Sequence, residues 1–557
     1  MGGRIQMKRL VFSGIITAIA MILVVDLALS ASESVNEAME SIRPQAIRAD
    51  MRFLADDMLE GRGTATRGHE LAAKYMATQF EAMGLEPAGD HGTYYQNVPL
   101  RSLMADKRNS FVSLTTLTDT ETLVPEEDYF VRGDPGRQSS AVEAEVVFVG
   151  FGVTAPQQNY DDYKTMDVNG KIVALAFGAP AFEPSMRAYY SSLVLKAKNA
   201  AAHGAVGMIV VDDPLGEQYY SFGARVRRLQ VPELRWLNSK GEPNDYFPQL
   251  RAIAYTSLKG AAKLLRNAPF SAEQVFATIK EGKSLSFPLP VSAKISVTTQ
   301  WKDTSSPNVV AVLPGSDPTL KAQYVIYSAH LDHLGIGDPV QGDNVYHGAL
   351  DNASGSTALL ESARAFRTLR TRPRRSILFL SVTGEESGLL GSDYFAHNPT
   401  VPKSSIVADL NSDGVMMIWP LQSIIPFGAE HSSLGKVMDV AAQRLGLSQS
   451  EDPNPEQFFF IRSDQYSFVQ QGIPAVWPSP GFKSNDAAID PQAIFANWQK
   501  TRYHKPQDSI EQPGLNFEEA AKYVRFCFLA IYLIAEEPQR PKWNDADFFG
   551  VLYGALH

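Results

Sequence analysis

The chain has 557 residues, of which 44% are hydrophobic and 20% charged, and its formal net charge is -10 at pH 7. This length is too great for one compact core, so two or more domains are expected, and the composition is that of an ordinary globular protein. The negative charge argues against a nucleic-acid partner, because a nucleic-acid-binding face is usually basic.

The first thirty residues have the pattern of an export signal. A basic start at residues 4–9 is followed by an almost wholly apolar stretch at 10–29, and Ala28 and Ser30 are small residues spaced for cleavage. The apolar stretch is also close to membrane-spanning length, which leaves an uncleaved anchor as the alternative. We therefore predict a periplasmic or secreted protein that meets the membrane only if this segment is uncleaved.

Apolar residues recur at helical spacing from Ile42 to Gly84, which predicts packing helices. From Ala141 the pattern changes to short apolar strands that alternate with a helix. The strands are expected at 146–152, 171–175 and 206–211, and the helix at 196–203. This predicts a small α/β unit that ends near Pro288.

After Pro307, long apolar strands alternate with helices. Strands are expected at 308–313, 324–329, 376–382, 406–410 and 475–478, and helices at 354–369 and 516–536. This alternation predicts an α/β fold with a mostly parallel twisted sheet and helices on both faces. The predicted division is a signal at 1–30, the first part of the main domain at 31–140, an inserted domain at 141–288 and a catalytic part at 289–557.

Side chains that can bind metals follow the ends of these strands, where ligands bind in open α/β sheets. They are His330 and Asp332 after the strand at 324–329, Glu385 and Glu386 after 376–382, Asp413 after 406–410, Asp351 before the helix at 354, and His504 in a later loop. Taken alone, each would be explained as a helix cap or a loop residue. Their shared position at one edge of the sheet predicts a metal site instead.

Histidine and carboxylate ligands suit zinc. Five ligands exceed the three that an open catalytic zinc uses, but they are enough for two metals if one carboxylate bridges them. The site also needs an unligated carboxylate as general base, and the adjacent pair Glu385 and Glu386 offers one ligand and one base. His333, beside Asp332, is expected in a loop and is given no role. No glycine-rich phosphate loop follows any strand, which argues against a sugar- or nucleotide-binding protein.

Six segments resemble the co-catalytic zinc aminopeptidases, a family that includes bacterial leucyl aminopeptidases, aminopeptidase Y and glutamate carboxypeptidase II. They are SAHLDH at 328–333, GALDNASG at 348–355, GEESGLLGS at 384–392, NSD at 411–413, RSDQYSF at 462–468 and YHKPQD at 503–508. The segment 141–288 is similar to the protease-associated domain that many members carry, through YDDY at 160–163, GKIV at 170–173 and GAVG at 204–207.

The resemblance implies two zinc ions per chain and a role for each site residue. His330 and Asp413 would hold one zinc, Glu386 and His504 the other, and Asp351 would bridge them. Glu385 would be the general base, Asp332 would orient His330, and Tyr466 would hydrogen-bond the tetrahedral intermediate. Gln465, before Tyr466, departs from the histidine that is common in the family.

The expected activity is that of an aminopeptidase that hydrolyses N-terminal residues from peptides. The segments around the site are acidic and contain one arginine, Arg462, which favours recognition of an amine over a clamp for a terminal carboxylate. A carboxypeptidase or dipeptidase on the same scaffold is the second hypothesis, and a glutaminyl cyclase is the third. A catalytically inactive, receptor-like binding protein is the alternative of another class, against which the intact ligands and base argue.

Overall fold

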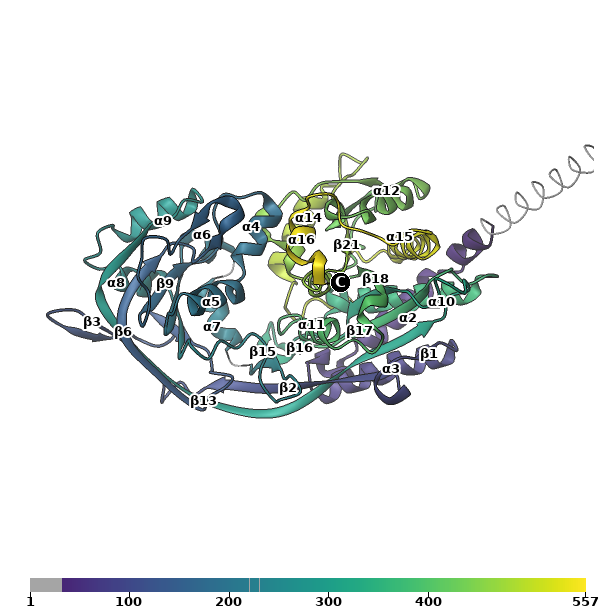
Figure 1. The fold of residues 1–557 in the computed structure, drawn as a ribbon. Coiled ribbons are helices and arrows are strands. Elements are labelled where there is room, and N and C mark those ends of the chain that lie inside the picture. The colour runs from purple at the N-terminus through teal and green to yellow at the C-terminus, as the bar shows by residue number, and fades with distance from the viewer. Residues whose placement is uncertain (1–32, 220, 230, 557) are drawn as a thin grey trace, which may run out of the picture.

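The computed structural model describes residues 33–219, 221–229 and 231–556. The predicted export signal at residues 1–30 lies outside the described residues. Across these described ranges, no helix combines the length and the apolar character needed to cross a membrane. The chain forms two α/β lobes, which Figure 1 shows side by side and linked along one edge by long strands.

The larger lobe is built on a sheet whose central strands are parallel. β14 (Tyr324–His330) lies between β17 (Ser376–Val382) and β18 (Ile406–Asn411), and β21 (Ala475–Pro480) continues the parallel set. β13 (Ser286–Leu313) and β19 (Ser423–Phe427) flank it in antiparallel orientation. The predicted α/β fold with a mostly parallel sheet is confirmed, and its central strands end at one common edge.

Helices cover both faces of this sheet. One face packs against α2 (Pro44–Leu54), α3 (Arg67–Ala82), α10 (Ser354–Thr368), α12 (Leu434–Arg444) and α15 (Phe517–Glu536). The other face packs against α11 (Leu390–His397), α13 (Gln465–Val469) and α16 (Phe548–Tyr553). Val325 and Tyr327 of β14 face the first set, and Ile326 faces the second. Burial on both faces explains why these strands are continuously apolar in sequence.

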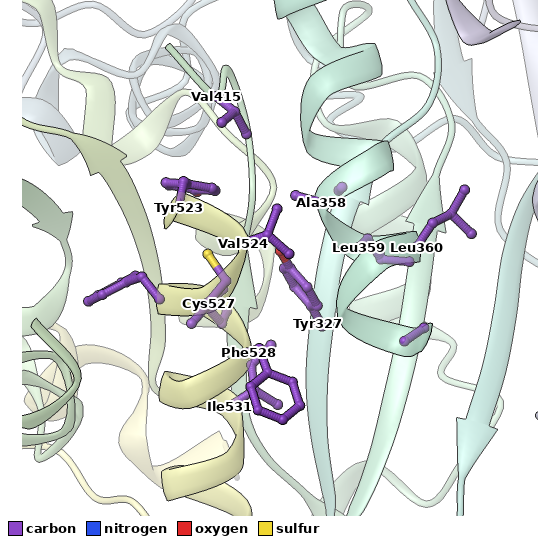
Figure 2. Close-up of a cluster of buried hydrophobic side chains, with 14 of the residues drawn as sticks. Tyr327, Ala358, Leu359, Leu360, Val415, Tyr523, Val524, Cys527, Phe528 and Ile531 are labelled. Carbon is purple, nitrogen blue, oxygen red and sulfur yellow. The ribbon is translucent and has the colours of Figure 1, made fainter. Parts of the chain in front are cut away.

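The core of the larger lobe is closed by α15, one of its longest helices. Figure 2 shows Val524, Cys527 and Phe528 of α15 packed beside Tyr327 of β14 and the residues of α10. Cys527 is fully buried and forms no disulfide. Burial raises the pKa of Cys527 to about 11, so its thiol is an unreactive part of the core.

The smaller lobe has a sheet of its own. β6 (Ser139–Val149), β9 (Ile172–Ala176), β10 (Gly207–Val211) and β12 (Ile253–Thr256) are parallel neighbours, and β5 (Tyr129–Val131) pairs with β12. On the other side of β6 come β13 and then β3 (Phe111–Thr115) and β4 (Thr120–Thr122). The lobe therefore recruits strands from before residue 141, where the inserted domain was predicted to begin.

β13 is one strand of 28 residues that runs through both sheets. Its first part pairs with β6, its middle with β2 (Tyr95–Ala105), and its last part with β17. Figure 1 shows it as a long arc beneath both lobes. The predicted boundary at 288/289 falls inside this strand. Pro288 suggested a break, but a proline is tolerated at a bulge, and the register of β13 shifts between Pro288 and Ser292.

A second contact joins the lobes at α4 (Pro184–Ser191) of the smaller lobe. Ser185 Oγ lies 3.0 Å from His431 Nε2, and His431 Nδ1 lies 2.7 Å from Asp547 Oδ2 in the larger lobe. Tyr189 of the same helix packs edge-on against Phe548, with ring centroids 5.4 Å apart. The smaller lobe is thus held in place by packing as well as by the shared strand.

Candidate metal centre

The predicted ligands come together at the edge where β14, β17 and β18 end. His330 is the last residue of β14, Glu385 and Glu386 follow β17, Asp413 follows β18, Asp351 precedes α10, and His504 lies in the loop before α15. Among the described residues, two groups of three could hold a metal ion, and Asp351 belongs to both.

The first group is formed by His330, Asp351 and Asp413. His330 Nε2 lies 3.4 Å from Asp351 Oδ1 and 3.3 Å from Asp413 Oδ1. Ser463 Oγ donates a hydrogen bond of 2.6 Å to the other carboxylate oxygen of Asp413. This bond fixes Asp413 with its Oδ1 turned toward His330.

The second group is formed by His333, Asp351 and Glu386, and His504 lies beside it. His504 Nε2 lies 3.2 Å from Asp351 Oδ2 and 3.2 Å from Glu386 Oε2. His333 Nδ1 lies 2.7 Å from Glu386 Oε1 and 4.0 Å from Asp351 Oδ2. Asp351 therefore presents one oxygen to each group, which is the geometry of a bridging carboxylate.

Buried polar side chains hold the Asp351 segment in place. The carboxylate of Asp508 accepts the backbone N–H of Leu350 at 3.1 Å and that of Asp351 at 3.0 Å. The side chain of Asn352 donates to the carbonyl of Ser412 at 3.0 Å and accepts the N–H of Gly355 at 2.9 Å. These bonds fix Asp351 relative to the end of β18, where Asp413 lies.

Asp332 holds the loop that carries the two glutamates. Its Oδ1 accepts the backbone N–H of Glu385 at 3.1 Å, and its Oδ2 accepts Thr64 Oγ1 at 2.9 Å and the N–H of Glu386 at 3.4 Å. His330 Nδ1 lies 3.1 Å from the backbone oxygen of Asp332 but 3.9 Å from its carboxylate. The orientation of His330 therefore comes first from the Asp332 backbone, while the carboxylate shapes the loop.

The side chains of both groups fit a pair of zinc ions. Ligand atoms on one tetrahedral zinc, with bonds of about 2.0–2.2 Å, lie roughly 3.3 Å apart, and the four contacts of His330 and His504 are 3.2–3.4 Å. The ring nitrogens of His333 and Glu386 Oε1 are buried and make no aligned hydrogen bond. Buried polar atoms without partners are costly, and a cation would satisfy them.

The electrostatics of the site also favour cations. Burial lowers the pKa of His504, but the carboxylates of Glu386 and Asp351 outweigh it and raise the pKa to about 9. Burial likewise lowers the pKa of His330, but the carboxylates of Glu385 and Asp413 outweigh this effect and raise the pKa well above its ordinary value. Both shifts reflect an excess of negative charge, which divalent cations would neutralise.

Glu385 lies beside both groups and belongs to neither. Burial raises the pKa of Glu385 well above its ordinary value, and the charges of Asp413 and Glu386 add to this rise. A carboxylate near the metal groups that is not needed as a ligand suits a general base. The roles assigned to the individual site residues stay predictions.

Tyr466, which was predicted to hydrogen-bond the tetrahedral intermediate, lies among aromatic side chains of the core. Tyr466 is buried, packs against Phe460 and Phe549, and its hydroxyl group hydrogen-bonds with Tyr553. The turn of α13 instead directs Gln465 toward β18, where its Oε1 accepts from the side chain of Asn411 at 3.2 Å. The role predicted for Tyr466 stays a prediction.

Tyr503 is the phenol that lies at the site. Its ring stacks on His504 with centroids 3.8 Å apart. Burial raises its pKa well above the ordinary value, Arg462 opposes this rise, and the carboxylates of Asp351 and Glu386 add to it. The sequence signal that could have identified Tyr503 is its position directly before the predicted ligand His504.

His333 is the second residue whose place the sequence did not reveal. It was expected in a loop, but it is 1% exposed and contacts Glu386 in the second group. It follows Asp332 directly after the end of β14, so the strand end carries two histidines. His333 is a member of the second group of three, and His504 is the further side chain beside it.

Comparisons with known proteins agree with this architecture. Residues 308–525 match the model of Peptidase family M28, and residues 142–245 match the PA domain. The aminopeptidase from Aneurinibacillus sp. strain AM-1 superposes with a TM-score of 0.52 over 91% of this chain and 97% of that chain, at 19% identity. At this identity the superposition shows the fold alone.

Two mouse proteins are similar in sequence over part of their length. Aminopeptidase NAALADL1 is 28% identical over 286 residues, which are 44% of this chain and 36% of the mouse protein. Carboxypeptidase Q is 26% identical over 205 residues, which are 36% of this chain and 38% of the mouse protein. The match thus spans little more than a third of each of these relatives.

Together, the sheet, the ligand groups at its edge and the domain matches define a metallopeptidase. Residues 308–525 have the pattern of peptidase family M28, and the smaller lobe contains the segment that matches the PA domain.

Proposed function

We propose that the chain is an exported aminopeptidase with two zinc ions, which hydrolyses N-terminal residues from peptides. The observation that carries this proposal is the bridging position of Asp351 between two ligand groups, with the unligated Glu385 beside them. Export is supported by the pattern of the first thirty residues. The names of the bacterial and mouse aminopeptidases support the direction of attack.

The proposed mechanism assigns one task to each residue. His330 and Asp413 would hold one metal, Glu386 and His504 with His333 beside them would hold the other, and Asp351 would contribute a carboxylate oxygen to each. Bound zinc would polarise the scissile carbonyl and make a water molecule more acidic. Glu385 takes the proton from the attacking water and delivers it to the leaving amine.

Tyr503 takes the place that the sequence had suggested for Tyr466. Its ring stacks on His504 beside the ligands, and its hydroxyl group would donate a hydrogen bond to the oxyanion of the tetrahedral intermediate. Such donors act in the transition state and contribute to kcat.

A substrate panel tests the proposed activity. Amino-acid amides and short peptides with a free amine are expected to be hydrolysed, and the N-acetylated forms of the same substrates are expected to resist. The surrounding carboxylates can pair with a free ammonium group but gain nothing from an acetamide. A chelator should abolish hydrolysis, and added zinc should restore it.

A carboxypeptidase is the second candidate. The name of mouse carboxypeptidase Q supports it, and so does Arg228 of the smaller lobe, which donates to the backbone oxygen of Glu386. Arginine is suited to hold a terminal carboxylate. If acetylated peptides with a free carboxylate are the better substrates, the aminopeptidase assignment is wrong and this candidate replaces it.

A further inference from the structure

The PA domain places a basic helix next to the loop that carries Glu385 and Glu386. This helix, α7 (Phe222–Arg228), lies on the side of the smaller lobe that faces the larger lobe in Figure 1. Arg228, its last residue, donates a hydrogen bond from Nη2 to the backbone oxygen of Glu386. The contact joins the smaller lobe directly to a predicted metal ligand of the larger lobe.

The position of α7 is fixed by the core of its own lobe. Phe222 is buried against Phe130, with ring centroids 5.5 Å apart. Arg225 forms an ion pair with Asp212, whose side chain is fully buried. Since the two lobes are also joined through β13 and α4, the location of Arg228 follows from packing in the smaller lobe.

The glutamate loop is held on two sides by different lobes. The carboxylate of Asp332 accepts the N–H groups of Glu385 and Glu386. The backbone oxygen of Glu385 accepts within the turn, from Gly388 at 2.8 Å and Leu389 at 3.0 Å. The backbone oxygen of Glu386 instead accepts a hydrogen bond from Arg228. The PA domain therefore orients the peptide group between Glu386 and Ser387.

A further contact supports the helix that continues from this loop. Trp236 in β11 (Glu233–Trp236) donates from Nε1 to Asp393 of α11 at 2.7 Å. Residues 228 and 236 both lie within the segment that matches the PA domain. The loop and the helix after it are thus each tied to that segment by one side chain.

We propose that Arg228 is a positioning residue, through which the PA domain orients the loop that carries the general base and a metal ligand. The inference rests on the proposed function. The PA domain then supplies no metal ligand, yet the catalytic loop reaches its working geometry only when the domain is docked. Displacing a catalytic group by about 1 Å can cost around 10²-fold in rate, so loss of this bond should be felt in kcat.

The test compares Arg228→Ala with Arg228→Lys in the full chain, with Arg227→Ala as matched control. Arg227 is the preceding residue of the same helix, carries the same charge and is exposed. Arg228→Ala is expected to lower kcat about 10- to 100-fold with KM little changed. Arg228→Lys should recover part of the loss because it keeps a cationic donor, and Arg227→Ala should stay within about twofold of wild type.

Two further readouts separate positioning from other roles. Arg228→Ala should release zinc to a chelator faster than wild type, because the backbone of the ligand Glu386 is less constrained. In a double-mutant cycle with Glu385→Gln, the two losses should be less than additive in free energy, since both act on the same base. Thermal unfolding of each variant shows whether the fold is retained.

The results distinguish the inference from the proposed function. A raised KM with unchanged kcat for Arg228→Ala would mean that Arg228 binds substrate, and would overturn the positioning role. The positioning role would also be overturned if Arg228→Ala keeps the kcat and the zinc-release rate of the wild type while Glu385→Gln is inactive. If Glu385→Gln leaves activity intact, the proposed function fails first.

Discussion

Replacing Glu385 with glutamine is expected to lower kcat about 10²–10⁴-fold while both metal positions remain filled. Glutamine keeps the shape of the side chain but cannot accept a proton. Glu385 lies outside both ligand groups, so its carboxylate is free for proton transfer. The checks are steady-state kinetics on a free-amine substrate and metal content after dialysis.

Glu386→Gln is the matched comparison for this variant, since it makes the same chemical change one residue later. Glu386 contacts both His504 and His333, so its replacement should weaken binding at the second metal position. The expected result is metal loss from Glu386→Gln and metal retention in Glu385→Gln. If the two variants behave in the opposite way, the assignments of base and ligand are reversed.

Asp351→Asn is expected to have the largest effect, because Asp351 contributes one oxygen to each ligand group. An amide presents a single oxygen with no full charge, so the bridge is lost and both metals should bind weakly. Each metal contributes several kcal/mol to the transition state, so activity should fall by at least about 10³-fold. Elemental analysis and kinetics on the same preparation measure both consequences.

Asp338→Asn provides the control for this change. Asp338 is exposed on β15 (Gly335–Val340), the strand that follows the His333 segment, and its side chain belongs to neither ligand group. It should retain wild-type metal content and activity. If Asp351→Asn retains both metals, Asp351 does not bridge them.

The ligand positions could be predicted because they follow strands that the sequence marks clearly. β14, β17 and β18 are buried on both faces, so their sequences are continuous apolar runs with sharp ends. Parallel strands place those ends together, where His330 is the last residue of β14 and Asp413 follows β18. Burial of these parallel strands therefore explains both the apolar runs in the sequence and the grouping of the ligands at the strand ends.

Other features depend on packing that sequence does not encode locally. Tyr466 and Gln465 are neighbours on one short helix, yet Tyr466 packs against Phe549 and Gln465 hydrogen-bonds Asn411 of β18. His333 has the surroundings of a loop residue in sequence but is buried and contacts Glu386 in the fold. Arg228 lies 158 positions from Glu386 in the chain, and no periodicity connects them.

The predicted boundary at 288/289 falls inside β13 for a related reason. β13 alternates between buried and exposed residues over much of its length and contains prolines, so it did not match a continuous apolar strand. Pairing with β6 and β17 at its two ends makes it one element. Strand pairing of this kind is non-local and can only be read from the fold.

The central claim, a two-metal site bridged by Asp351, is tested most directly by anomalous diffraction at the zinc edge on crystals of the zinc-loaded protein. Two anomalous peaks about 3.5–4 Å apart are expected, one beside His330 and Asp413 and one beside Glu386 and His504, with a carboxylate oxygen of Asp351 on each. A single peak, or two peaks that Asp351 does not bridge, in protein that is fully active would contradict it.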